Sequence, residues 1–426
     1  MSPLYLVLNR YDDEFGEYHR FVDRGSCRLA YITLAAGLDV LDTAGAVDTV
    51  VVESLDLATV LPVARRLVAR HGKPAGIVGL SEFDLHTASE LRAELGVAGW
   101  APEFVLTFRD KVWMKELVAA AGVRVPRFRE LDDTFTASRV EAEVGMPVIL
   151  KPRAGAASSG VVRAADAARL ERALASVDPR DYECEEYVEG DIHHVDGVRR
   201  GGAFHFVSAS AYVNTCLDFA HGTPLGSVLL DPGPLRDQVL SFAADCLDAL
   251  ALTDGPFHLE LIRTAAGELV FLEVGLRPGG AEVAFIHRDL YGIDLMEEAF
   301  RATLGLPSRT APEEFDEYRA GGWALMPEPR PLPSRITDVR GLGGGIPQVY
   351  EEISPAVGDV FDGTGGYWHV GGRFRLRGRD QAEVRQAVLQ IFERYVVTAE
   401  PLPAREEAAL PARESSVLLA VGEGAV

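Results

Sequence analysis

Two glutamates in neighbouring apolar segments could hold a metal ion. The segments 257–264 and 268–275 read as two strands, and the small residues between them predict a hairpin. In that hairpin Glu260 and Glu273 would face each other on one side of the sheet. Like charges at opposed positions repel unless a cation lies between them, and Mg²⁺ prefers oxygen ligands. The pattern therefore indicates a site for a divalent cation.

The register of the hairpin decides this interpretation. The length of the turn predicts that Thr264 faces Leu269 and that Ile262 faces Phe271, which brings the two glutamates together. A different register, or a solvated sheet face that tolerates two acids, would remove the need for a metal. Both alternatives stay open on the sequence alone.

A lysine followed by a run of small residues could hold phosphate. Lys151 ends the apolar strand 147–151, and the side chains from Ala154 to Gly160 are all small. Backbone N–H groups can approach an anion closely where side chains are small, and the lysine adds a positive charge. The residue order of a Walker A loop is absent. The alternative interpretation is an ordinary turn.

Two further segments could complete a nucleotide site. Arg277 lies in the glycine-rich turn 275–280, where it could stabilise charge on a transferring phosphoryl group or, alternatively, be a surface arginine. The segment 182–190 reads as a strand followed by a turn, whose backbone could bind an adenine edge. Polar candidates for a substrate pocket, each of which could equally be a structural group, are Tyr212, Asn214, His221, His258 and His287.

Alternating strands and helices must position these residues. The first hundred residues contain apolar segments that read as strands (4–8, 29–34, 48–52, 76–80) and helical patterns (61–70, 84–95). This alternation predicts a parallel sheet, with Pro62 in the first turn of its helix. No G-x-G-x-x-G follows the first strand, so a dinucleotide fold is unsupported. Beyond residue 106 the predicted strands (147–151, 182–188, 203–212, 257–264, 268–275) and helices (110–121, 137–144, 165–175, 235–250, 295–304, 380–395) are mixed. The predicted fold class is therefore α/β followed by α+β.

Composition excludes several classes of protein. The chain has 426 residues and a formal net charge of −22, which disfavours nucleic acid as a partner because phosphate backbones are bound by Lys and Arg. No apolar run is long enough to cross a membrane, and the first residues lack the pattern of a secretory signal. We therefore expect a cytoplasmic protein without a membrane partner. Four scattered cysteines predict buried thiols rather than a disulfide framework or a zinc site.

Taken together and in this order, these pieces resemble the ATP-grasp superfamily, in its carboxylate–amine ligase branch. The resemblance runs from about residue 75 to 305, and its motifs are specific as an ordered set. By this resemblance Glu260 and Glu273 are the metal ligands and Arg277 is the catalytic arginine. The residues that the resemblance assigns to ATP are Lys111, Lys151, Gly155, Ser158, Ser159, Gly160, Glu185, Glu186, Tyr187 and Val188.

The resemblance also implies an architecture. We expect an amino-terminal α/β domain, two α+β lobes that grip ATP, and a small carboxy-terminal β-rich module that ends in a helix. The predicted ranges are 1–105 for the amino-terminal domain, 106–190 for the small lobe with its linker helix, 191–310 for the large lobe, 311–400 for the carboxy-terminal module and 401–426 for a mobile tail.

The implied activity is ADP-forming ligation. ATP would phosphorylate a small-molecule carboxylate to an acyl phosphate, and an amine would displace the phosphate to form an amide or peptide bond. The implied cofactors are ATP and two Mg²⁺ ions, for which Mn²⁺ could substitute. A homodimer is a further expectation. The alternatives are a ligase that uses a non-amine nucleophile and a catalytically degenerate ATP-binding regulatory protein.

Two positions depart from the family pattern. The family usually has Asn two residues after the second metal carboxylate, and this chain has Gly275 there. The family also often has an acidic residue that binds ribose near the position of Ile192. In this chain Asp191 or His193 would have to serve, and we predict His193 as part of the ATP site.

Overall fold

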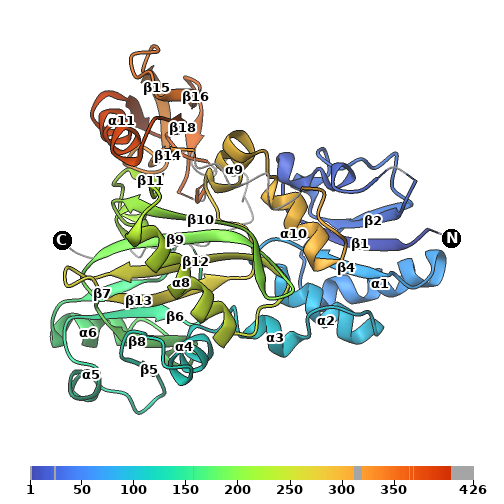
Figure 1. Cartoon of the computed structure of the whole chain (residues 1–426), viewed down its shortest axis with the longest axis horizontal. Coiled ribbons are helices and arrows are strands. Elements are labelled where there is room, and N and C mark those ends of the chain that lie inside the picture. The colour runs from blue at the N-terminus through green and yellow to red at the C-terminus, as the bar shows by residue number, and fades with distance from the viewer. Residues whose placement is uncertain are drawn as a thin grey trace.

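The structure is a computed structural model that describes residues 2–23, 25–156, 158–310, 319–363, 365–367 and 369–403. Its strands form sheets that helices cover, with the amino-terminal part beside a long central sheet (Figure 1). From position 404 onward, the predicted tail lies outside the described residues. Within the described ranges, no helix combines the length and the apolar character that a membrane span requires.

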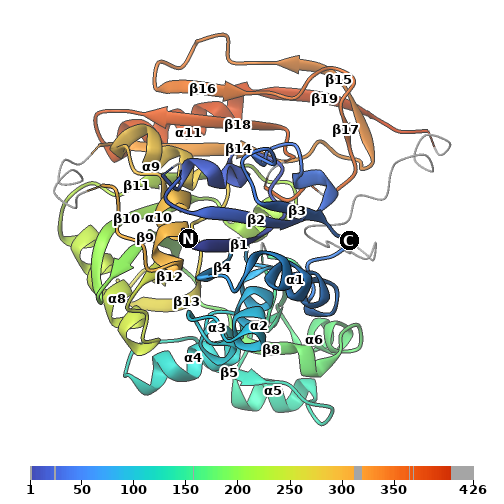
Figure 2. The same ribbon diagram turned by 90° about the vertical axis from the view of Figure 1, so that its right-hand side faces the viewer.

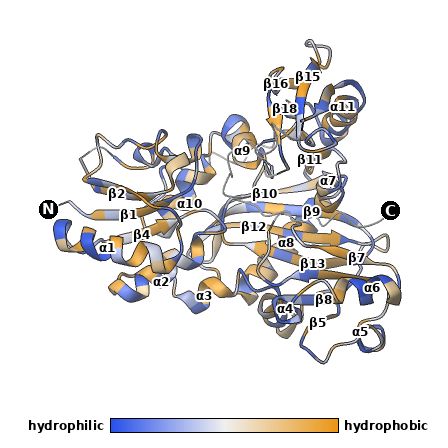
Figure 3. Ribbon diagram, turned by 180° about the vertical axis from the view of Figure 1, so that it is seen from behind, coloured by the Kyte–Doolittle hydropathy of each residue, from blue (hydrophilic) through white to orange (hydrophobic). Residues whose placement is uncertain are grey.

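The amino-terminal sheet is parallel, as the alternation of strands and helices predicts. Its strand order is β3-β2-β1-β4. Every residue of β1 is buried, which is why this strand reads as a continuous apolar run. Apolar residues line these strands, whereas α1 also carries hydrophilic residues (Figure 3). The elements are β1 (Leu4–Asn9), β2 (Arg28–Thr33), β3 (Asp48–Val51), α1 (Leu57–His71), β4 (Gly76–Gly79), α2 (Leu85–Leu95) and α3 (Pro102–Leu106), with 3₁₀ turns at Glu14–Gly16, Tyr18–Arg20 and Ala35–Gly37.

The first helix begins earlier than predicted. The side chain of Asp56 accepts a hydrogen bond from the backbone N–H of Thr59, and this N-cap starts α1 at Leu57. Pro62 therefore lies inside the helix, and the prediction that it stands in the first turn is wrong.

The predicted small lobe contains a four-stranded antiparallel sheet in the order β5-β8-β6-β7. Two helices pack on it around buried residues such as Val140, Leu150 and Leu170. The helix α4 precedes this sheet in the chain. The elements are α4 (Lys111–Ala120), β5 (Phe128–Glu130), α5 (Ala137–Glu143), β6 (Val148–Pro152), β7 (Val162–Ala164), α6 (Ala167–Leu174), a 3₁₀ turn (Pro179–Asp181) and β8 (Tyr182–Glu186).

The large sheet has eight strands in the order β13-β12-β9-β10-β11-β14-β18-β16 and carries a core on each face. On one face, α4 and α8 pack over Phe257, Leu259 and Phe271. On the other face, α9, α10 and the amino-terminal sheet pack over Val198 and Phe206 (Figure 1). The elements are β9 (Asp191–Arg200), β10 (Ala203–Val213), α7 (Cys216–Ala220), β11 (Leu225–Leu229), α8 (Pro234–Ala249), β12 (Gly255–Arg263), β13 (Leu269–Gly275), α9 (Val283–Tyr291), α10 (Leu295–Thr303), β14 (Gly321–Met326), β16 (Val349–Ile353), β18 (Gly372–Arg377) and α11 (Gln381–Arg394).

The carboxy-terminal strands extend this large sheet. β14 pairs antiparallel with β11, and β18 and β16 follow outward, at the opposite end of the molecule from α5 and α6 (Figure 2). A separate small sheet contains β15 (Ser334–Arg340), β17 (Val360–Phe361) and β19 (Val396–Pro401). The predicted carboxy-terminal module thus shares its main sheet with the predicted large lobe, and the division into domains stays a prediction.

The cysteines are free thiols at scattered positions. Cys184 and Cys246 are buried, whereas Cys27 and Cys216 are half-buried. Burial raises the pKa of Cys184 to about 12, so this thiol stays protonated at neutral pH.

Candidate active site

Glu260 and Glu273 occupy directly opposed positions on β12 and β13, as the sequence predicts. The predicted register between this pair and the turn is wrong by one residue. The structure pairs Ile262 with Val270 and Arg263 with Leu269. A β-bulge leaves Leu272 without an opposite residue, and this extra residue in β13 restores the pairing of the two glutamates.

The opposed carboxylates suit a divalent cation. The Tyr212 hydroxyl donates a hydrogen bond to Glu260 Oε1 over 2.8 Å, and Lys111 Nζ lies 3.3 Å from Glu273 Oε2. Burial by itself would raise the pKa of Glu260, but hydrogen bonds from His258 and Tyr212 lower it below its usual value. Glu260 is therefore a carboxylate at neutral pH, and two carboxylates supply the oxygen ligands that Mg²⁺ prefers.

Lys111 lies at the amino-terminal end of α4. The side chain of Asp110 caps this helix by accepting hydrogen bonds from the N–H groups of Val112 and Trp113. From this position Lys111 Nζ donates a hydrogen bond to the carbonyl oxygen of Gly155 over 2.7 Å, in addition to its ion pair with Glu273. The lysine therefore connects the candidate metal carboxylates to the small-residue loop.

Lys151 belongs to a buried group of four charges. Its Nζ lies 2.7 Å from Glu185, and Lys115 Nζ lies 2.6 Å from Glu183 and 2.5 Å from Glu185. Burial alone would lower the pKa of Lys151, but Glu185 and Glu183 raise it, so the lysine remains charged. We did not identify Lys115 or Glu183 from the sequence. The signal was available, because Lys115 stands one helical turn after Lys111, and the two glutamates alternate along one strand.

The predicted adenine hinge begins in the last two residues of β8 and continues just beyond the strand. Glu186 is half-buried and forms ion pairs with Arg124 at 2.6 Å and Arg127 at 2.7 Å. The Arg163 guanidinium lies 3.9 Å from the centroid of the Tyr187 ring. Val188 follows in the half-buried segment directly after the strand. Cations thus hold the side chains of the hinge, while its role toward adenine stays a prediction.

The loop between β6 and β7 has the conformation that its small residues allow. Ser158 and Gly160 have φ values of 57° and 70°, in the left-handed region. Ser159 lies between them in the same turn. A Cβ atom at Gly160 would lie 2.7 Å from the Tyr182 hydroxyl, so a larger residue would need a shift there. Arg109 Nη2 holds the loop by donating a hydrogen bond to the Ala154 carbonyl over 3.0 Å.

Arg277 is held by a glutamate of the amino-terminal part. Its Nε donates a hydrogen bond to Glu82 Oε2 over 2.6 Å, and Arg109 pairs with the other oxygen of the same carboxylate. Burial by itself would raise the pKa of Glu82, but the two arginines lower it to about 2. We did not identify Glu82 from the sequence. Its place just beyond the carboxyl end of β4, where α/β sheets bind ligands, was the available signal.

The two departures from the family pattern have different surroundings. A Cβ atom at Gly275 would lie 3.0 Å from Glu82 Oε2, so Glu82 lies against the position where the family has an asparagine side chain. His193 is buried, with Nδ1 3.2 Å from the Asp191 carbonyl oxygen, and burial lowers its pKa. The Asp191 residue is exposed. The ribose role of either residue stays a prediction.

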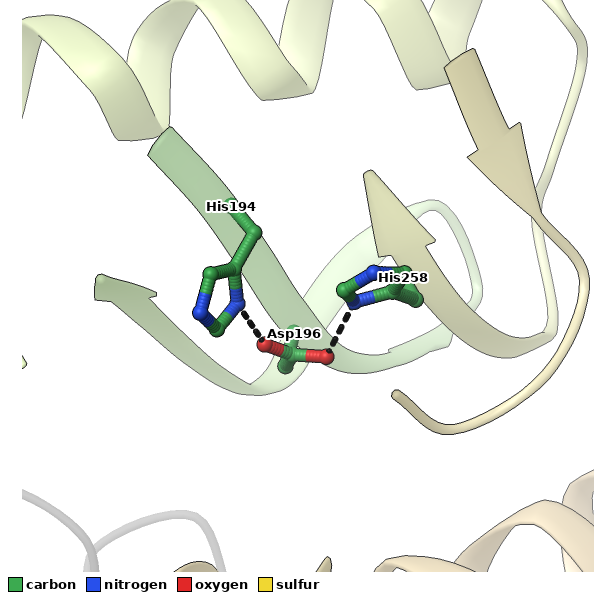
Figure 4. A group of neighbouring side chains, drawn as sticks. All are labelled: His194, Asp196 and His258. Atoms are coloured by element: carbon green, nitrogen blue, oxygen red, sulfur yellow. Dashed lines mark hydrogen bonds and ion pairs between the residues drawn. The ribbon is translucent and has the colours of Figure 1, made fainter. Parts of the chain in front are cut away.

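A group of buried polar side chains lies beside Glu260. Asp196 is bracketed by His194 and His258 (Figure 4), and His194 also contacts Ser227. Burial by itself would raise the pKa of Asp196, but the two histidines lower it, so Asp196 is a carboxylate. Burial by itself would lower the pKa of His258, but Asp196 and Glu260 raise it to about 10.

The other substrate candidates have varied positions. Tyr212 contacts Glu260, as described above, whereas Asn214 donates a hydrogen bond to the Pro224 carbonyl over 2.7 Å. His221 lies at the end of α7, with Nδ1 2.8 Å from the Leu217 carbonyl oxygen. His287 is buried against Ser208, on the face of the large sheet that also carries Asp196.

Comparisons with known proteins agree with this architecture. No family model matches the sequence. The L-arginine-specific L-amino acid ligase of Bacillus subtilis is 25% identical over 236 residues, which cover 54% of this chain and 57% of that protein. The N5-carboxyaminoimidazole ribonucleotide synthase of Mycobacterium tuberculosis is 28% identical over 219 residues, which cover 45% of this chain and 46% of that protein. The chain thus spans about half the length of these curated relatives.

A solved structure covers almost the whole chain. The crystal structure of L-amino acid ligase from Bacillus licheniformis has a TM-score of 0.75 and 18% identity, and the match covers 93% of this chain and 98% of that one. The ADP complex of N5-carboxyaminoimidazole ribonucleotide synthetase follows with a TM-score of 0.67 and 14% identity, over 92% and 97% of the two chains. The chain therefore has the fold of these ligases, which is the ATP-grasp fold.

Proposed function

We propose that the chain is an ATP- and Mg²⁺-dependent ligase that activates a small carboxylate and couples it to an amine. The carboxylate oxygen attacks the γ-phosphorus of ATP, the bond to ADP breaks, and an acyl phosphate forms. The amine nitrogen then attacks the acyl carbon, phosphate leaves, and the nitrogen loses a proton. The observation that carries the proposal is the opposed pair Glu260–Glu273 beside Lys111.

The charged side chains suit this chemistry. Bound Mg²⁺, two ions by this proposal and replaceable by Mn²⁺, would offset the charge of the phosphates. When ATP binds, Lys111 would give up its hydrogen bond to the Gly155 carbonyl, and Lys151 would give up its ion pair with Glu185. Each lysine would bind phosphate oxygens instead. Arg277, oriented by Glu82, would stabilise charge that develops during transfer. By this proposal the loop 155–160 would close over the phosphates and keep water from the acyl phosphate.

The relatives support amide or peptide bond formation over the alternatives. Two of them are named amino acid ligases. A ligase with a non-amine nucleophile would share the first chemical step and differ in its product. A degenerate regulatory protein would bind ATP without turnover, and Gly275 is the feature that favours it.

The test is to incubate the protein with ATP, Mg²⁺ and pools of amino acids and other small carboxylates while ADP and phosphate are followed together. Glu273→Gln removes a candidate metal ligand. Glu268→Gln is the matched control, because Glu268 lies in the same hairpin with a side chain 54% exposed. We expect pool-dependent release of both products that E273Q abolishes and E268Q retains.

The other outcomes distinguish the alternatives. A product that forms in a pool from which amines are left out would indicate a different nucleophile. ATP binding without ADP release from any pool would favour the regulatory protein. Equal activity of E273Q and the unchanged chain would refute the metal role of Glu273. Light scattering of the purified protein would test the proposed homodimer.

A further inference from the structure

The proposed function leaves a buried polar network unexplained. The face of the large sheet that packs on α9 is mostly apolar, yet it contains His194, Asp196 and Ser227 with at most 2% of each residue exposed. Burying a carboxylate is strongly unfavourable unless its oxygens are hydrogen-bonded. Such a network needs a physical reason, and its geometry supplies one.

Asp196 fixes the orientation of two imidazole rings. His194 Nδ1 lies 2.5 Å from Asp196 Oδ2, and His258 Nδ1 lies 2.8 Å from Asp196 Oδ1 (Figure 4). A carboxylate only accepts hydrogen bonds, so both Nδ1 atoms donate. His194 Nε2 lies 2.6 Å from the hydroxyl oxygen of Ser227, which completes the network on that side.

His258 extends the network to the candidate metal site. Because its Nδ1 is bound to Asp196, its Nε2 is directed elsewhere and lies 3.5 Å from Glu260 Oε1. The Tyr212 hydroxyl binds the same oxygen over 2.8 Å. Both contacts that the structure shows for this carboxylate use Oε1, which leaves Oε2 for a cation. We propose that His258 is a positioning residue, held by Asp196, that fixes Glu260 for binding a divalent cation.

This inference rests on the proposed function, because it assigns a partner to the same metal site. A second observation supports it. A Cβ atom at Gly279 would overlap Asp196 Oδ1 and would lie 3.0 Å from His258 Nδ1. The turn that carries Arg277 therefore packs directly on the Asp196–His258 pair. One buried pair thus supports both the carboxylate of β12 and the turn after β13.

The network could instead be a metal site of its own, since the ligand atoms of His194, Asp196 and His258 lie within 4.8 Å of one another. The hydrogen-bond geometry argues against this. In the hydrogen-bonded arrangement each Nδ1 donates its proton to Asp196, so a metal would have to displace both protons and break both contacts. Positioning is the role that the distances support.

The test uses two substitutions of His258, each of which keeps one of the two hydrogen-bonding positions of the imidazole ring. His258→Asn retains an amide N–H near the place of Nδ1, so it can bind Asp196 but cannot reach Glu260. His258→Gln places its amide nitrogen near the place of Nε2, so it can still donate to Glu260. His287→Asn is the matched control, because His287 of α9 is buried against the same face of the large sheet and contacts Ser208 and the Val283 carbonyl. Glu260→Gln is the reference for loss of the site.

The measurement is the affinity for Mn²⁺ in the presence of ADP, followed by electron paramagnetic resonance, with thermal unfolding of each variant as the check of folding. We expect H258N to bind Mn²⁺ about tenfold more weakly than the unchanged chain, which is the lower end of the loss found for partners of metal ligands. H258Q should recover most of the affinity, and H287N should keep it.

Each contrary result has a distinct meaning. Unchanged Mn²⁺ binding by E260Q would overturn the metal site and with it the proposed function. Weak binding by E260Q together with unchanged binding by H258N would overturn the positioning role alone. Equal losses in H258N and H287N, or no recovery in H258Q, would show that general packing and not the contact with Glu260 sets the affinity.

Discussion

Replacing Glu82 with glutamine removes a carboxylate that pairs with both Arg109 and Arg277. Burial opposes the charge of Glu82, yet the arginines lower its pKa from 4.5 to about 2. This difference between the folded and unfolded chain corresponds to about 3 kcal/mol of stability at neutral pH. We therefore expect E82Q to lower the free energy of unfolding by up to about 3 kcal/mol at pH 7.

The effect should depend on pH with a definite sign. The pKa of Glu82 is lower in the folded chain, so its stabilisation is complete above the unfolded value of 4.5 and is lost as the pH falls toward 2. At pH 3 the same pKa values leave about 1 kcal/mol. The difference between the unchanged chain and E82Q should shrink accordingly between pH 7 and pH 3.

Urea unfolding followed by tryptophan fluorescence at pH 7, 5 and 3 measures this difference. Glu94→Gln is the control, because Glu94 forms an exposed ion pair with Arg65 over 3.0 Å, and such pairs contribute about 0–1 kcal/mol. A loss in E82Q that is the same at pH 7 and pH 3, or no larger than that of E94Q, would refute the electrostatic reasoning.

Three further predictions concern buried groups. Lys115→Met removes one of the two buried lysines that pair with Glu183 and Glu185 and leaves Lys151 beside both carboxylates. Urea unfolding should show a loss of about 3–5 kcal/mol, whereas a loss below about 1 kcal/mol would contradict the ion-pair role. Gly197→Ala places a methyl group against a carbonyl oxygen of β10, so differential scanning calorimetry should show a lower Tm. An unchanged Tm would mean that β9 and β10 can move apart at this position without loss of stability. Burial raises the pKa of Glu328 from 4.5 to about 7, so stability should fall as the pH rises through this window, and Glu328→Gln should flatten that dependence of Tm; a parallel pH dependence in both chains would exclude Glu328 as its source.

Local patterns identified the glutamate pair at the centre of the site, but not the register of the residues between this pair and the turn. The turn length placed Glu260 opposite Glu273, although the residues next to the turn pair one position away from the prediction. The bulge at Leu272 restores the pairing of the glutamates. An ordinary apolar residue carries no sequence signal for a bulge, because the distortion follows from packing on both faces of the strand.

For a related reason, the sequence did not show which residues far apart in the chain are partners. Glu82 and Arg277 are 195 residues apart in the chain, and no local spacing connects them. Asp196 and His258 meet because β9 and β12 are neighbours in the large sheet, where the order of the strands does not follow the chain. The pairing of β11 with β14 also joins strands that are far apart in the chain, and it brings the carboxy-terminal strands into that sheet.

By itself, the sequence determined the periodicity of most strands and helices, and the order of lysines, small-residue loop, glutamates and arginine. These features depend on residues that are close in the chain, where backbone geometry relates spacing to direction. Only the tertiary structure decided which charges share a buried partner, such as Lys115 with Glu183 and Arg277 with Glu82. Ion pairs and hydrogen bonds depend on distances through space, and those distances follow from how the sheets pack.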